Sequence, residues 1–86
     1  MNIIKLIAIV KKKIEKQVII ENIEIEDKSF LHKNHKGHQE GKYHLKIFIK
    51  SVELNKMSKI ESNKKIFKIL DEEMKQFIHS LQILIN

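Results

Sequence analysis

The sequence predicts a small α+β domain in which helices cover one face of a short sheet, in the element order α-β-β-α-α-β. Three observations lead to this prediction. Apolar residues recur with helical spacing at the start of the chain, alternate with polar residues in two later stretches, and return to helical spacing before a last alternating stretch. Since 86 residues suffice for one domain, we expect a single domain spanning residues 1–86.

The first predicted element is an amphipathic helix over residues 2–17. Its apolar residues follow the i, i+3, i+4, i+7 pattern, and Asn2 is a candidate N-cap. Lysines gather in its last turns, where cations interact favourably with the helix dipole. The apolar run at the start of this helix is too short to span a bilayer and lacks the signal-peptide pattern, so we expect no membrane association.

Two strands are predicted next, joined by a long connection. Ile23 and Ile25 alternate with polar residues inside the segment 18–29, and residues 43–51 alternate again. Each strand therefore buries one face, and the simplest pairing of the two is antiparallel. The connection, residues 30–42, holds both glycines and three of the five histidines of the chain. Loops of this length in small domains are often functional.

The second half of the chain is predicted to be mainly helical. Ser58 and Glu61 form a capping-box pattern at a helix start. We expect a short first helical segment that includes Ile60, followed by a longer helix that ends near residues 75–77.

Residues 78–85 are predicted to form the third strand. In the alternating pattern, His79 is in phase with three apolar residues of this strand, Leu81, Ile83 and Ile85. Taken alone, this phase predicts a buried or half-buried histidine.

The composition restricts the chemistry. The chain has no cysteine, which excludes disulfides, thiolate nucleophiles and cysteine-ligated metals supplied by this chain alone. Any metal must be held by His, Asp or Glu, or by the thiolates of a partner. An enzyme is not expected, because Asp71, Glu72 and Glu73 share one helical turn and no serine has the glycine neighbours of a nucleophile elbow.

Four segments share their order and spacing with one known family. The matching positions are Asp27, Ser29, His32, His35 and Gly37, then Tyr43, His44 and Leu45, then Ser51, Leu54, Ser58, Ile60, Ile66 and Leu70, and finally Glu72, Glu73, Ile78, His79, Ser80 and Leu81. With these residues the chain resembles the BolA family over roughly residues 12–85. The resemblance implies a BolA-like α-β-β-α-α-β sandwich related to the type II KH fold. One departure is residues 62–64, where the family usually carries Arg-His-Arg.

The resemblance also implies a function in iron–sulfur cluster maturation or iron regulation. In the family, the loop between the first two strands supplies one metal ligand, and the histidine that opens the last strand supplies another. Residue by residue, the implied loop ligand is His32, with His35 as the alternate, and the second ligand is His79. The implied partner is a monothiol, CGFS-type glutaredoxin, whose cysteine and bound glutathione contribute thiolates to a shared [2Fe–2S] cluster.

Imidazole suits a ligand position in a cluster that two proteins share, because it is a good neutral ligand for iron and can be protonated near neutral pH. We expect the free protein to be a monomer without a cluster. We expect it in the cytoplasm, or alternatively in the mitochondrion if the source is eukaryotic.

The main alternative is a KH-like, nucleic-acid-binding transcriptional regulator. The net charge of +6 permits such a role without requiring it. Some members of the family are transcription regulators, and the segments after the second strand resemble a helix-turn-helix. Four lysines there are available for phosphates: Lys59, Lys64, Lys65 and Lys68. Against this alternative, acidic residues follow directly, and the chain has no Gly-x-x-Gly of a KH-type site.

The residues lead to two further predictions about the histidines. A free-standing zinc site of His32, His35 and His38 is disfavoured, because their three-residue steps require a helix that Gly37 opposes. For His44, which lies on a strand beside Lys46, we expect a structural role or a role in supporting a ligand.

Overall fold

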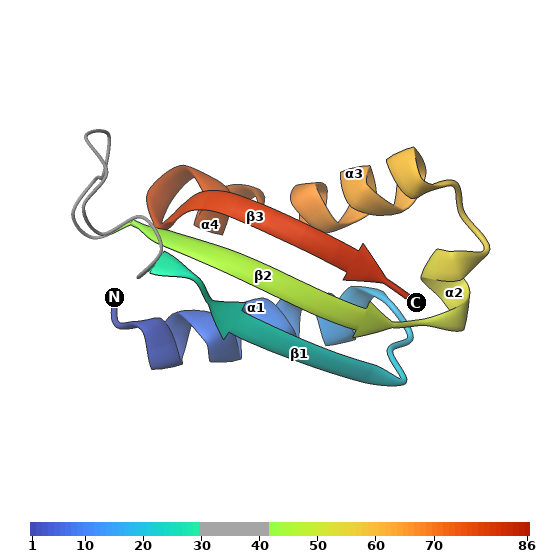
Figure 1. Ribbon diagram of the computed structural model, residues 1–86, viewed down its shortest axis with the longest axis horizontal. Coiled ribbons are helices and arrows are strands. Elements are labelled where there is room, and N and C mark those ends of the chain that lie inside the picture. Colours follow the sequence, from blue (N-terminus) through green and yellow to red (C-terminus); the bar gives the residue numbers. More distant parts are fainter. Residues whose placement is uncertain (30–41) are drawn as a thin grey trace.

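A computed structural model describes residues 1–29 and 42–86. In this part of the chain, a three-stranded sheet is accompanied by four helical segments, which confirms the predicted α+β class (Figure 1). The elements in chain order are α1 (Ile3–Gln17), β1 (Asn22–Asp27), β2 (Tyr43–Lys50), α2 (Val52–Asn55), α3 (Lys59–Ile69), α4 (Asp71–Gln76) and β3 (Ile78–Ile85).

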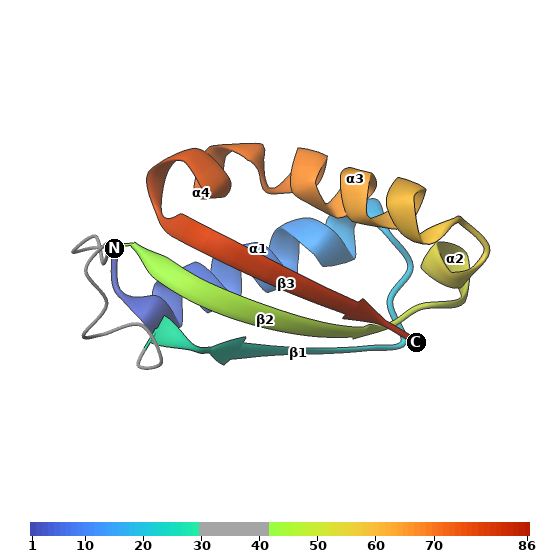
Figure 2. The same ribbon diagram turned by 45° about the horizontal axis from the view of Figure 1, so that its top comes forward.

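The sheet has the order β1-β2-β3, with β2 in the centre. β1 runs antiparallel to β2, as predicted, and β3 runs parallel to β2. The parallel pair needs a crossover connection, and the helices α2, α3 and α4 provide it. The helices lie on one face of the sheet, as Figures 1 and 2 show from two directions. The other face, called the outer face below, has no helix over it in the described structure.

The core lies between the sheet and the helices. Leu45, Ile47 and Ile49 of β2 are buried on the helix side, while Lys46 and Phe48 alternate with them on the outer face. This matches the predicted alternation of the second strand. The remaining core residues come from every layer and are Leu6, Val10, Ile14, Val18, Ile23, Leu54, Ile66, Leu70, Ile78 and Ile83.

Helix α1 begins where the sequence predicts it. The side chain of Asn2 caps the helix, with its Oδ1 accepting a hydrogen bond from Lys5 N at 2.8 Å. Leu6, Val10 and Ile14 form its buried stripe. No helix in residues 1–29 and 42–86 combines the length and apolarity needed to cross a membrane.

The helical crossover differs from its prediction in segmentation. A short helix, α2, precedes the capping box, and Ile60 lies in α3. The predicted long helix is broken at Leu70, whose φ of −98° and ψ of 19° leave the helical region while its side chain is fully buried. Three acidic residues, 71–73, then fill the first turn of α4, where they suit the positive end of a helix dipole. This acidic run is the feature of the sequence that indicates a new helix start, which the prediction of one long helix missed.

Candidate functional site

One end of the sheet gathers the residues that flank the segment 30–41. Ser29 lies just before this segment, and its Oγ accepts a hydrogen bond from His44 N at 3.0 Å. Just after the segment, Tyr43 N donates to Phe77 O at 2.8 Å. The two anchors of the segment and the start of β3 therefore lie at the same end of the sheet.

At this end, β3 carries one residue more than β2. Tyr43 pairs with Ile78, but His44 pairs with Ser80, so His79 has no partner across the strand pair. Such an extra residue rotates the strand and changes which side chains face out. The side chain of His79 is exposed as a result. The prediction that His79 is buried in phase with Leu81 is therefore wrong, because the irregularity shifts the phase by one residue.

His44 lies directly beside His79 on the outer face. Their ring centroids are 5.0 Å apart, with the ring planes inclined at 63°. His44 is itself buried, with 7% of its surface exposed, and its Nδ1 lies 2.6 Å from Ser80 Oγ. This hydrogen bond fixes one ring nitrogen of His44, which agrees with the structural role expected for it.

The predicted loop ligands His32 and His35 lie outside the described residues, as does His38. Within residues 1–29 and 42–86, no group of three or more His, Cys, Asp or Glu side chains is placed to hold a metal ion. The described part of this site therefore offers the exposed imidazole of His79, with His44 beneath it.

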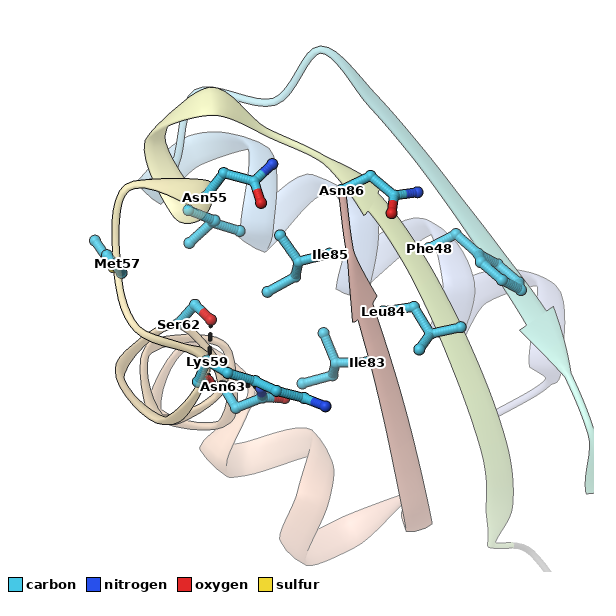
Figure 3. A pocket seen from close by; sticks show the side chains of 11 residues that line it. Phe48, Asn55, Met57, Lys59, Ser62, Asn63, Ile83, Leu84, Ile85 and Asn86 are labelled. Carbon is cyan, nitrogen blue, oxygen red and sulfur yellow. Dashed lines mark hydrogen bonds between the residues drawn. The ribbon is translucent and has the colours of Figure 1, made fainter.

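The four lysines of the predicted nucleic-acid site do not all line the same groove. Lys59 lines a groove of about 440 Å³ between α3 and β3, shown in Figure 3. Lys65 and Lys68 line a different groove of about 580 Å³, together with two lysines of α1, Lys13 and Lys16. Lys64 is exposed and lines neither groove.

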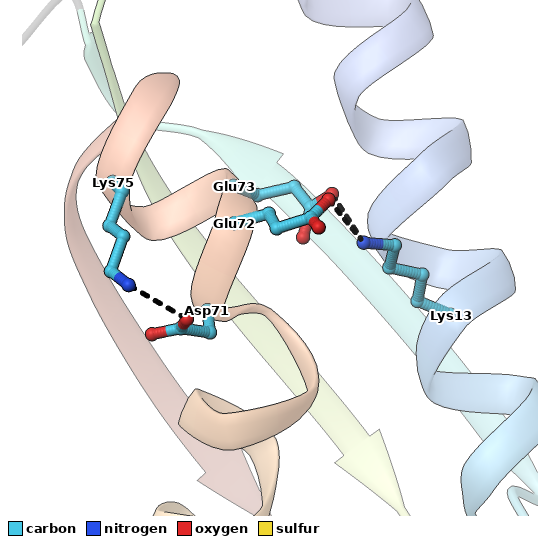
Figure 4. Close-up of polar contacts among 5 residues, drawn as sticks. All are labelled: Lys13, Asp71, Glu72, Glu73 and Lys75. Carbon is cyan, nitrogen blue, oxygen red and sulfur yellow. Dashed lines mark ion pairs between the residues drawn. The ribbon is translucent and has the colours of Figure 1, made fainter.

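Carboxylates partly neutralise the second groove. Lys13 Nζ lies 2.7 Å from Glu73 Oε2 and 3.7 Å from Glu72 Oε2, which joins α1 to α4 (Figure 4). The hydrogen bond to Glu73 raises the pKa of Lys13 above its ordinary value, as does the negative charge of both carboxylates. Lys65 Nζ lies 3.6 Å from Glu53 Oε2.

Sequence patterns did not reveal the groove of Figure 3 or the contact of His44 with His79. The groove takes Asn55 from α2, Asn63 from α3 and Asn86 from the end of β3. These residues have no common spacing in the chain. The pairing of the histidines depends on strand register, which periodicity within one strand does not report.

Comparison with known proteins gives one consistent result. A sequence model of the family described as "BolA-like protein" matches residues 14–86. A relative named "DNA-binding transcriptional regulator BolA", from Haemophilus influenzae, is 29% identical over 75 residues, covering 87% of this chain and 70% of the relative.

Solved structures agree with the sequence matches. The BolA domain of SufE1 from Arabidopsis thaliana is 26% identical, with a TM-score of 0.77, and covers 92% of this chain and 87% of the solved chain. BolA1 from Arabidopsis thaliana is 24% identical, with a TM-score of 0.78 and the same coverages of 92% and 87%, and supports the fold.

Proposed function

This chain belongs to the BolA-like protein family, and from that membership we propose that it is an adaptor in iron–sulfur cluster maturation or iron regulation. It binds a monothiol, CGFS-type glutaredoxin and co-ligates a [2Fe–2S] cluster, which is its cargo. His79 is one ligand, and His32, with His35 as the alternate, is the other. The proposal contains no catalytic step by this chain.

The observation that carries the proposal is the exposure of His79 at the sheet end where the segment 30–41 is anchored. A ligand shared with another protein must be accessible, and the strand irregularity turns this imidazole outward. Ser29 and Tyr43 hold the two ends of the histidine-bearing segment at the same end of the sheet. His79 therefore lies at the end of the sheet where the residues that flank this segment are held.

The ligands that this chain can supply fit a cluster shared with a partner better than a cluster held by this chain alone. Iron–sulfur clusters are generally held by thiolates, and histidine replaces cysteine in some. This chain has no cysteine, so it cannot supply thiolates, whereas an exposed imidazole can complete a site that a partner begins. The buried, hydrogen-bonded ring of His44 supports His79 from below and limits the positions that its ring can take.

A reconstitution experiment tests this function. The protein is mixed with a monothiol glutaredoxin, glutathione, ferrous iron and sulfide under anaerobic conditions, and visible circular dichroism is recorded. We expect a spectrum distinct from that of the glutaredoxin homodimer, lost in His79→Ala and changed in His32→Ala or His35→Ala. His38→Ala, a matched histidine removal in the same segment, should leave the spectrum unchanged. An unaltered homodimer spectrum at every mixing ratio would exclude the proposal.

A second candidate function is nucleic-acid binding, favoured by the name of the Haemophilus influenzae relative and by the lysines of the α1–α3 groove. In this function Lys65 and Lys68 contact phosphates, together with Lys16. Each phosphate contact adds about one unit to the slope of log affinity against log salt. We expect Lys65→Gln and Lys68→Gln each to lower that slope for a labelled DNA duplex, and Lys75→Gln, on α4, to leave it unchanged. If the protein does not bind the duplex at low salt, this candidate function is ruled out.

A further inference from the structure

We propose that the groove between β3 and α3 binds an extended, acidic peptide segment of a partner protein, which adds as a fourth strand to the free edge of β3. This groove lies at the far end of β3 from His79. The inference goes beyond the cluster-binding function and does not depend on it.

The free edge of β3 is the first argument. In the described structure β3 pairs with β2 alone, so the backbone groups on its other edge have no strand partner. Proteins usually protect such edges with charged residues or proline. The opposite edge of the sheet follows this rule, because β1 carries Glu24, Glu26 and Asp27. Residues 78–85 contain no lysine, acid or proline, so β3 lacks the charged and proline residues that protect an edge.

The position of the groove is the second argument. Residues 83–86 all line it, although consecutive side chains of a strand point to opposite faces. One cavity can contact four consecutive residues where it runs along the edge of the strand. Figure 3 shows Ile83 and Ile85 directed toward α3, and Leu84 directed away toward Phe48. Four residues of a strand extend over about 13 Å, which suits a segment of four or five residues.

The walls of the groove specify the chemistry of the occupant. Met57, Leu84 and Ile85 form accessible apolar surface, whereas Leu54 and Ile83 are buried, and three asparagines supply amide donors and acceptors. Lys59 carries the one charged side chain among the described residues that line the groove, so these side chains together have a positive charge. An extended segment with alternating apolar and acidic side chains matches these walls, since its backbone pairs with β3 and a carboxylate reaches Lys59.

Other occupants fit less well. Single-stranded nucleic acid is bound by several cations together with aromatic stacking platforms, and this groove offers one lysine and one phenylalanine. A second copy of the chain would have to place its β3 in the groove together with the α3 that lies beside that strand. A cavity of about 440 Å³ between strand and helix holds a short segment rather than a folded edge.

The test uses two six-residue probe peptides that alternate valine with glutamate, one in each phase, with free carboxylates. They are titrated into the full ¹⁵N-labelled chain. We expect the amide signals of residues 83–86 to shift and their hydrogen exchange to slow. The same peptides with alternate backbone amides N-methylated keep their side chains but lose the donors for strand pairing, and at least one methylation pattern should abolish the shifts.

A pair of variants tests the charge. Lys59→Gln should weaken peptide binding about two- to fivefold, which is the range for one exposed ion pair. Lys64→Gln removes the same charge from the same helix outside the groove and should leave binding unchanged.

Four results would overturn the inference. The first three are no shift with either peptide at millimolar concentration, equal binding of all N-methylated peptides, and tighter binding of an oligothymidine to residues 83–86. A concentration-dependent dimer that protects the β3 edge in sedimentation and exchange experiments would also overturn it, in favour of self-association. None of these results bears on the cluster spectrum, so the two proposals fail independently.

Discussion

The exposed ring of His79 and the buried ring of His44 form an edge-type contact, with 5.0 Å between the ring centroids. Ser80, the residue after His79, holds His44 through a contact of 2.6 Å between Oγ and Nδ1. Two neighbours on β3 thus act on the same imidazole of β2. This arrangement positions an accessible histidine on a supported surface, which a ligand shared with another protein requires.

Removing the support should cost stability. We predict that Ser80→Ala lowers the free energy of unfolding by about 1 kcal/mol, because the buried nitrogen of His44 loses this hydrogen bond. Urea denaturation followed by far-ultraviolet circular dichroism measures the loss. Gln82→Ala, at an exposed site two residues further along the same strand, should change the value by less than about 0.5 kcal/mol. Equal effects of the two variants would show that the contact with His44 contributes nothing.

Replacing the proposed ligand with a thiol should preserve the site and change its potential. On the proposed function, His79→Cys still forms the mixed cluster with glutaredoxin, whereas His79→Ala does not. Since histidine in place of cysteine raises the potential of a [2Fe–2S] centre, His79→Cys should lower it. Protein-film voltammetry of both complexes measures the change. An unchanged potential would mean that residue 79 does not contact the cluster.

Ser51 joins two parts of the fold that are distant in sequence. Its side chain is fully buried, donates to Ile19 O at 2.8 Å and accepts from Leu54 N at 3.1 Å. We predict that Ser51→Ala lowers the free energy of unfolding by about 2 kcal/mol, because Leu54 N loses a buried helix cap and Ile19 O loses a part-buried hydrogen bond. Ser58→Ala removes an exposed helix cap and should cost about 1 kcal/mol. A larger loss of stability in Ser58→Ala than in Ser51→Ala, measured by thermal denaturation, would contradict this prediction.

The ion pair between α1 and α4 should give a pH-dependent contribution to stability. Lys13 contacts Glu73, whose side chain is 7% exposed, and Glu73 Oε1 has no hydrogen-bond partner among the described residues. Lys13→Met should therefore destabilise the fold at neutral pH, since it leaves a buried carboxylate without its cation. Lys75→Met breaks the exposed pair with Asp71 and should have a smaller effect.

The sign of the pH dependence follows from the pKa of Lys13, which folding raises above its ordinary value of 10.5. The folded state holds this proton more tightly, so the stabilising contribution is fully present below pH 10.5 and is lost as pH rises through the folded pKa. The difference between wild type and Lys13→Met in urea midpoints should be constant from neutral pH to about pH 10 and should shrink above pH 10.5. If the difference in urea midpoints stays constant in strong alkali, the effect comes from packing of the Lys13 side chain.

Local patterns in the sequence determined the element types of this protein. The helical spacing of apolar residues placed α1, Asn2 marked its start, and Ser58 with Glu61 marked the start of α3. The alternation of residues 43–51 predicted the buried face of β2, which Leu45, Ile47 and Ile49 form, whereas His44 on the other face is buried as well. These features depend on neighbours within about four residues, so hydrogen bonding and apolar burial specify them locally.

Only the tertiary structure decided which residues meet. The extra residue at His79 is defined by the pairing of β3 with β2, and the alternation of β3 alone therefore gave the wrong face for this side chain. The helix α3 ends at the fully buried Leu70, although the helical pattern continues through it. Likewise, the groove beside β3 exists because a parallel crossover sets α3 along a strand edge. Contacts between distant segments fix all three features, and spacing along the chain does not contain them.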